Sequence, residues 1–104
     1  DAIDDLDRAL TLDPDRVDAL VFRAAAWRNE SRLARAQQDI DRAVTLDPDN
    51  PEALLERGIE RKLAGDAAGA RADWQRAKTL SPDTATGDLA EQNLALLEAG
   101  PSSR

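Results

Sequence analysis

Three stretches of the sequence repeat one pattern: residues 8–15 read RALTLDPD, residues 42–49 read RAVTLDPD, and residues 76–83 read RAKTLSPD. The proline of each stretch lies 34 residues after the previous one. A constant spacing of this kind indicates a repeat architecture in which each unit is one supersecondary element. Because proline cannot continue a helix, it favours a helix end just before it. The pattern therefore predicts units that each finish with a helix.

The residues between the prolines predict two helices, A and B, in each unit. We expect helices over residues 16–28 and 33–46 in one unit, and over 51–63 and 67–80 in the next. Asn50 is a favourable N-cap for the second pair, and a proline at the first helical position is tolerated because that N–H has no helical partner. Strong helix formers dominate the composition, which includes 20 Ala and 14 Leu. The fold class expected is all-α.

Small residues alternate with large ones along the helices. In helix B the order small, large, small recurs at i, i+4 and i+7, as Ala36, Ile40 and Ala43 and then as Ala70, Trp74 and Ala77. Ala24 and Gly58 occupy matching places on helix A. Residues at these spacings share one helix face, so the stripe predicts close packing between A and B.

The period, the helix pairs and the prolines together resemble the tetratricopeptide repeat family. Its signature places are held by Leu20, Ala24, Trp27, Ala36, Ile40, Ala43 and Pro48, and by Leu54, Gly58, Gly65, Ala70, Trp74, Ala77 and Pro82. The departures are Arg23 and Arg57 in place of leucine, Arg61 in place of an aromatic residue, and Ser31 in place of the turn glycine. The resemblance covers residues 2–84. It implies a right-handed α-α superhelix, or solenoid, of antiparallel helix pairs.

This register divides the chain. We expect one domain over residues 1–100, made of helix B of a truncated first repeat (1–16), two repeats (17–50 and 51–84) and a C-terminal capping helix (85–100), followed by a disordered tail (101–104). The capping helix is expected to run from residue 88 to 99. Its leucines, Leu89, Leu94 and Leu97, would face the stack, and its acidic residues would face water.

The composition excludes several kinds of chemistry. The 104 residues include 21 acidic and 14 basic ones, so the formal net charge is -7, and there is no His or Cys. An acidic excess opposes binding to nucleic acid, and we expect no membrane insertion because no apolar run is long enough. Without imidazole or thiol, paired carboxylates are the remaining catalytic candidates, but neighbours such as Asp4 and Asp5 point to different sides of a helix. We therefore expect no enzyme activity, no catalytic residues, no cofactor and no metal site.

Two arginines lie at a fixed distance from aspartates. Arg23 precedes Asp39, and Arg57 precedes Asp73, by 16 residues in each case. Because the two members of each pair fall on antiparallel helices A and B, we expect an ion pair across the seam between the helices. The alternative is that all four charges are exposed and independent of one another.

The family resemblance implies which residues face the concave groove of a superhelix. These groove residues are Asp18, Val21, Phe22, Ala25 and Arg28 of one helix A and Glu52, Leu55, Ile59 and Lys62 of the next. Apolar side chains lie between an acidic edge and a basic edge, and uncovered apolar surface indicates a partner. We expect a scaffold that binds a peptide segment or helix of a protein partner. Its groove positions are largely apolar or acidic and lack the charged clamp that some family members use for acidic chaperone tails.

Two alternatives to a groove-binding scaffold are a structural spacer and a self-association module, the latter forming a homodimer through the exposed first helix. Cytoplasm is the default compartment, with periplasm as the alternative. The excess of 12 Arg over 2 Lys is typical of a GC-rich bacterial genome.

Overall fold

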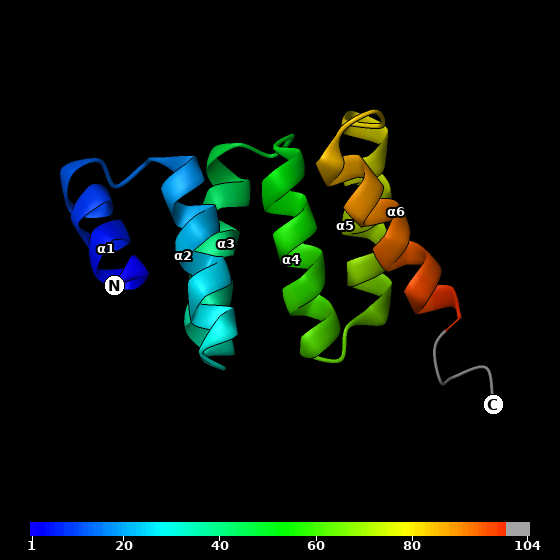
Figure 1. Ribbon diagram of the computed structural model, residues 1–104, viewed down its shortest axis with the longest axis horizontal. Coiled ribbons are helices and arrows are strands. Elements are labelled where there is room, and N and C mark those ends of the chain that lie inside the picture. Colours follow the sequence, from blue (N-terminus) through cyan, green and yellow to red (C-terminus); the bar gives the residue numbers. More distant parts are fainter. Residues whose placement is uncertain (100–104) are drawn as a thin grey trace. The chain divides into compact units, whose positions relative to one another are not determined.

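The computed structural model describes residues 1–99, and within that range it contains six α-helices and no strand (Figure 1). The helices are α1 (Ala2–Leu12), α2 (Val17–Asn29), α3 (Leu33–Leu46), α4 (Pro51–Leu63), α5 (Ala67–Leu80) and α6 (Ala85–Glu98). The all-α prediction is confirmed, and the bounds of α2 to α5 agree with the predicted ones to within one residue. The predicted tail and residue 100 lie outside the described residues, and the division into repeats stays a prediction.

The chain forms two compact units, Asp1–Pro48 and Asp49–Arg104. In the first unit, α2 packs against both α1 and α3. The predicted stripe of α3 is fully buried, since Ala36, Ile40 and Ala43 have no exposed surface. From α1, Ile3 and Leu10 contribute the buried side chains.

The second unit is built on the α4–α5 pair, and α6 packs against α5 and also touches α4. Its largest buried side chain is Trp74, which is 2% exposed. The Trp74 indole N–H donates a hydrogen bond to the Leu55 carbonyl at 3.1 Å. The ring lies directly against Gly58, where an added Cβ would be 2.3 Å from the indole nitrogen. Glycine at this position is therefore what allows α4 to approach so large a side chain.

Short turns join the two helices of each pair. Each turn contains one residue in the left-handed region, Ser31 with φ 61° and Gly65 with φ 90°. This conformation is strained for a residue with a Cβ and free of strain for glycine. Ser31, which stands where the family has a turn glycine, therefore keeps the same turn conformation as Gly65.

The last helix starts at Ala85, where the predicted capping segment 85–100 begins, so the expected helix start at residue 88 is wrong. Thr84 is the N-cap, and its hydroxyl accepts a hydrogen bond from the Gly87 N–H at 3.2 Å. Gly87 is buried against the Ser81 carbonyl, and a Cβ there would lie 1.9 Å from that oxygen. The prediction for Leu89 is also wrong, since it is 48% exposed while Ala90 takes the buried place.

Candidate functional site

Each helix pair contains the predicted ion pair. In the first unit the Arg23 Nε donates to Asp39 Oδ2 at 2.7 Å, and its Nη2 donates to Oδ1 at 2.8 Å. In the second unit Arg57 holds Asp73 in the same way, at 2.9 and 2.8 Å. The carboxylates are nearly buried, with side-chain exposures of 10% for Asp39 and 5% for Asp73. Two parallel hydrogen bonds to a buried carboxylate fix the register of the two helices, so these residues are structural.

The structure adds a further partner to each pair that the sequence did not predict. Arg61 Nη1 lies 3.2 Å from Asp73 Oδ2, so this carboxylate faces two guanidinium groups. In the first unit Arg23 also donates to Asp7 of α1 at 3.0 Å. The Arg61 departure from the family pattern therefore provides a second cation for a buried anion.

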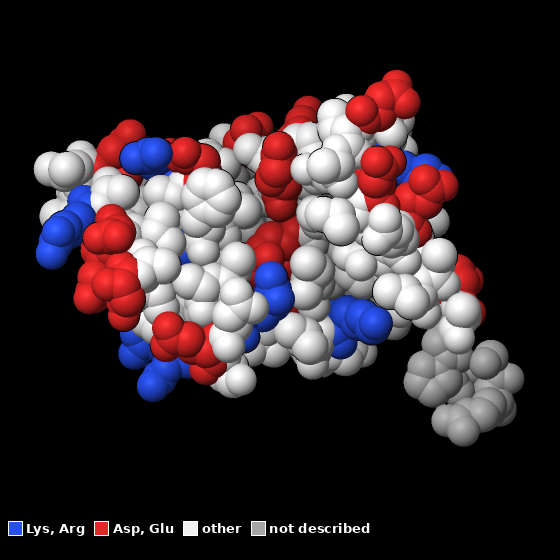
Figure 2. Space-filling view, viewed as in Figure 1, with Lys and Arg blue, Asp and Glu red and all other residues white. Residues whose placement is uncertain are grey.

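The predicted groove residues of α2 lie on one helix face. Phe22 is 62% exposed, and Val21, Ala25 and Arg28 are half-buried. Asp18 is exposed at the N-terminal end of this face. In Figure 2 much of the visible surface over α2 is neither acidic nor basic, as expected for an apolar strip. A phenylalanine this exposed makes α2 the more open of the two predicted faces.

The predicted groove residues of α4 are less open at their apolar positions. Leu55 and Ile59 are half-buried, while Glu52 and Lys62 at the two ends are exposed. The Leu55 carbonyl is held by the indole of Trp74. This hydrogen bond ties the backbone that carries Leu55 to α5.

Much of the predicted acidic edge is compensated by arginine within its own unit. The Asp18 carboxylate accepts hydrogen bonds from Arg16 at 2.9 and 3.2 Å. These hydrogen bonds hold the pKa of Asp18 below its ordinary value, and the Ala19 N–H acts in the same direction. At the helix starts, Asp15 pairs with Arg42 and Asp49 pairs with Arg76. Because these acids already have arginine partners, the apolar residues are the more distinctive feature of the α2 and α4 faces.

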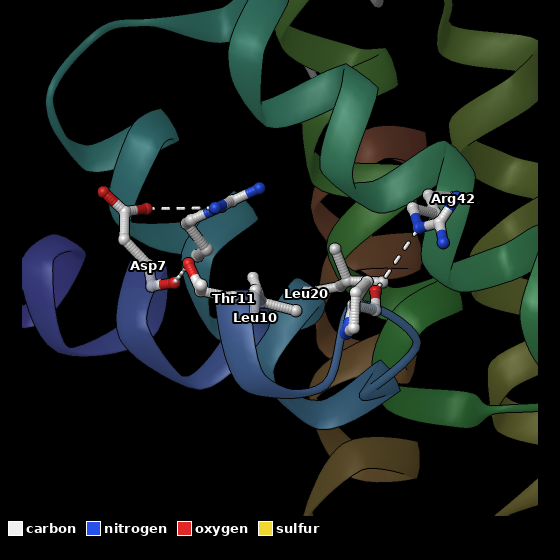
Figure 3. A pocket seen from close by; sticks show the side chains of 7 residues that line it. Asp7, Leu10, Thr11, Leu20 and Arg42 are labelled. Atoms are coloured by element: carbon white, nitrogen blue, oxygen red, sulfur yellow. Dashed lines mark hydrogen bonds and ion pairs between the residues drawn. The ribbon is translucent and has the colours of Figure 1, made fainter.

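The first unit also has an open pocket of about 520 Å³ among α1, α2 and α3 (Figure 3). None of the predicted groove residues lines it. Its charged groups already have partners, since Asp7 pairs with Arg23 and Arg42 donates to the Pro14 carbonyl at 3.4 Å. With its charges engaged in this way, the pocket has no evident polar group left to select a ligand.

Trp27, one of the signature positions of the family, is half-buried. The Arg35 guanidinium lies over its ring, 5.0 Å from the centroid. The equivalent place in the second unit holds Arg61, so the two units treat this position differently. An arginine stacked on the ring covers much of the face that a base or sugar would need.

Within residues 1–99, no group of three or more His, Cys, Asp or Glu side chains is arranged to hold a metal ion. Over the same residues, no helix has the length and apolarity needed to cross a membrane.

The architecture defines this chain as a helical-hairpin repeat protein. No family model matches it, and no curated protein matches it. Solved structures do, including the first TPR domain of Spaghetti (RPAP3) bound to the HSP90 peptide SRMEEVD, with 25% identity over 93% of this chain and 75% of that one and a TM-score of 0.81. The Arabidopsis OM64 TPR domain matches with 29% identity over 89% of this chain and 77% of that one and a TM-score of 0.77. The fold is therefore that of the tetratricopeptide repeat, as the sequence predicted.

Proposed function

We propose that this chain is a protein-interaction module that binds a peptide segment or helix through the exposed faces of α2 and α4. The proposal is supported by the fold, because similar domains include one bound to a peptide. The observation that carries it is Phe22, the single phenylalanine of the chain, which is 62% exposed between half-buried apolar neighbours. Exposed aromatic residues with an apolar surround are the usual anchors of a protein interface.

The partner is defined by the chemistry of these faces. On each face an apolar stripe of the partner would meet the apolar residues, which are Phe22 and Val21 on α2 and Leu55 on α4. Since Arg16 already neutralises Asp18, Glu52 is the acid best placed to attract a basic flank of the partner. We therefore propose a segment with regularly spaced apolar anchors and a modest basic flank.

The experiment is selection from a displayed library of random peptides on the wild-type chain, followed by affinity measurement with variants. Phe22→Asp should weaken the selected peptides by about tenfold or more, because a buried anchor typically contributes at least 1.4 kcal/mol. Leu96→Asp is the matched control, since Leu96 is 65% exposed on α6, outside both faces. Leu55→Asp should also abolish capture while leaving helicity intact. If the selected peptides bind Phe22→Asp as tightly as wild type, the α2 face is not the site.

The HSP90 peptide SRMEEVD provides a second test. In the RPAP3 complex this peptide is the ligand. Here the face of α4 has the exposed Glu52 at one end, Asp18 of the α2 face is paired with Arg16, and the centres of both faces are apolar. An acidic peptide would meet like charge, so we expect SRMEEVD to bind at least about tenfold more weakly than the selected peptides. Binding at equal strength would show that charge does not set partner choice.

The alternative is a structural spacer or self-association module. Light scattering across a concentration series separates it from the binding module. A constant monomer mass favours peptide binding, and a mass that rises towards that of a dimer favours self-association.

A further inference from the structure

The last helix, α6, carries two residues at places that correspond to the predicted groove of α4. Leu89 lies 34 residues after Leu55, and Asn93 lies 34 residues after Ile59. The helices α4 and α6 contact each other within the second unit and run in the same direction (Figure 1). Leu89 is 48% exposed and Asn93 is half-buried. We call Leu89 and Asn93 the α6 strip, which adds an uncharged surface to the α4 face.

The α6 strip lies on a side of the helix that a further helix of the repeat would not cover. On α4 the side that packs on α5 contains Gly58, which lies against the Trp74 ring. Leu55 and Ile59 of α4 keep part of their surface exposed although α5 is present. The place on α6 that corresponds to Gly58 is Gln92, which points to another side of the helix than Asn93. The strip is therefore open because of its place in the repeat, whatever follows α6 in the chain.

Asn93 is the polar residue of the strip. Within residues 1–99, its side-chain amide makes no hydrogen bond. Leu89 precedes it by one helical turn, and Ile59 holds the corresponding place on α4. In the free protein water can satisfy the amide, because Asn93 is only half-buried. A ligand that covers the strip removes this water, so it must provide hydrogen-bonding partners or leave the amide unpaired at a cost in affinity.

This requirement separates the two kinds of ligand, segment and helix, that the proposed function leaves open. The backbone N–H and C=O groups of a helix are bonded within the helix, so its apolar side would cover the Asn93 amide without a partner. In an extended segment, the N–H and C=O groups of one residue point to the same side. The asparagine amide can accept a hydrogen bond from the first group and donate one to the second. The amide therefore favours an extended ligand.

We propose that the second unit binds its partner as an extended segment across α4 and α6, with one backbone N–H and C=O pair bonded to the Asn93 amide. Alternate side chains of such a segment share one face, and uncharged ones would rest on Leu55 and Leu89. The inference rests on the proposed function of the α4 face and defines the conformation of its ligand. Leu96 corresponds to the charged Lys62 at the end of the α4 face and lies beyond the part that the segment covers.

The first test uses the peptides selected from the displayed library that lose binding to Leu55→Asp. Asn93→Leu keeps the approximate size of the side chain and removes both of its hydrogen-bonding groups. It should weaken these peptides by about tenfold, because two hydrogen bonds are lost. Gln75→Leu is the matched control, since it makes the same change from amide to leucine at an exposed place on α5. It should leave affinity within about twofold, and circular dichroism should show unchanged helicity in both variants.

A second measurement identifies the backbone group. Each backbone N–H of a selected peptide is replaced in turn by an ester oxygen, which removes one donor and leaves the side chains in place. One ester should weaken binding to the wild type by about fivefold and binding to Asn93→Leu by less than about twofold. The effect should be absent in the variant because the oxygen that accepts this hydrogen bond is gone.

Four outcomes would overturn the inference while dependence on Leu55, and so the proposed function, remains. Tighter binding of Asn93→Leu would mean that an apolar helix face covers this place, because leucine removes the cost of an unpaired amide. Unchanged binding would place Asn93 outside the site. Equal weakening by Gln75→Leu would show that the effect is not local, and the absence of a coupled ester would show that no backbone N–H is bonded. If Leu55→Asp weakens no selected peptide, the α4 face is not a site and both proposals fail there.

Discussion

Replacing Gly58 by alanine tests how the second unit is packed. The new Cβ would lie 2.3 Å from Nε1, 2.6 Å from Cδ1 and 2.9 Å from Cε2 of the Trp74 ring. Contacts this short force the ring or the helix to move. The ring is 2% exposed and its N–H is bonded to the Leu55 carbonyl, so it has little room to shift. We therefore expect Gly58→Ala to destabilise the protein, although alanine is the better helix former.

The magnitude follows from three contributions. Overpacking a tight core costs about 1–3 kcal/mol. Displacing the indole from the Leu55 carbonyl removes a hydrogen bond worth about 0.5–1.5 kcal/mol. The gain from replacing glycine by alanine within a helix is about 1 kcal/mol. The net loss of unfolding free energy should be about 1–3 kcal/mol.

The first unit supplies the matched control for this change. At the equivalent places it has Ala24 and Ile40, both fully buried, so a Cβ is accommodated where the opposing side chain is smaller. In a Trp74→Ile background, Gly58→Ala should therefore become stabilising by about 0.5–1 kcal/mol, through helix propensity alone. The sign of the alanine effect should reverse between the two backgrounds.

Urea unfolding followed by far-ultraviolet circular dichroism measures all four proteins of this double-mutant cycle. A stabilising osmolyte at one fixed concentration keeps the folded baseline of Trp74→Ile measurable. The expected coupling between residues 58 and 74 is about 1.5–4 kcal/mol. A coupling below about 0.5 kcal/mol would show that the ring and the glycine do not restrict each other, and the packing argument would fail.

Three further predictions concern charge and backbone. A double-mutant cycle on Arg57 and Asp73 should give a coupling of about 1.5–3 kcal/mol in urea unfolding, since the hydrogen bonds join charged groups and the carboxylate is nearly buried; zero coupling would make the pair structurally irrelevant. Ser31→Gly should stabilise the protein by about 0.5–1 kcal/mol, because the turn residue has a positive φ and the next unit already uses glycine there; a lower thermal midpoint would contradict this. By NMR titration the pKa of Asp18 should lie below its ordinary value and rise in Arg16→Ala. Because the folded-state pKa is the lower one, the contribution of this pair to stability is present above the unfolded-state pKa and is lost as pH falls through the folded-state pKa.

The bounds of α2 to α5 were predictable because their signals are local. Prolines, N-caps and apolar spacing act within a few residues, and the period of 34 repeats them in register. The spacing of 16 residues also led us to expect that Arg23 would contact Asp39, because antiparallel helices A and B place these two residues opposite each other. At α6 the expected start at residue 88 overlooked a local signal, the N-cap Thr84, whereas the close approach of Gly87 to the Ser81 carbonyl is seen only in the structure.

The candidate site was predicted less completely than the fold. The residue types of the α2 and α4 faces came from the family resemblance, and only the tertiary structure shows that Phe22 is 62% exposed while Val21, Leu55 and Ile59 are half-buried. The partners of Asp18 and the second cation on Asp73 were also missed, because arginine side chains are long and several can reach one carboxylate.

The sequence by itself determined the helices and the repeat period, because these depend on short-range chemistry and on a constant spacing. It suggested the ion pairs between helices A and B but left independent charges as an alternative, which the structure decided. Only the tertiary structure decided which equivalent positions are covered. Leu6 and Ile40 occupy the same place in the repeat, yet one is half-buried and the other fully buried. The physical reason is that a side chain is buried only when a second surface covers it. The repeat pattern specifies the residues of a helix face, and the neighbouring helix decides whether water reaches them.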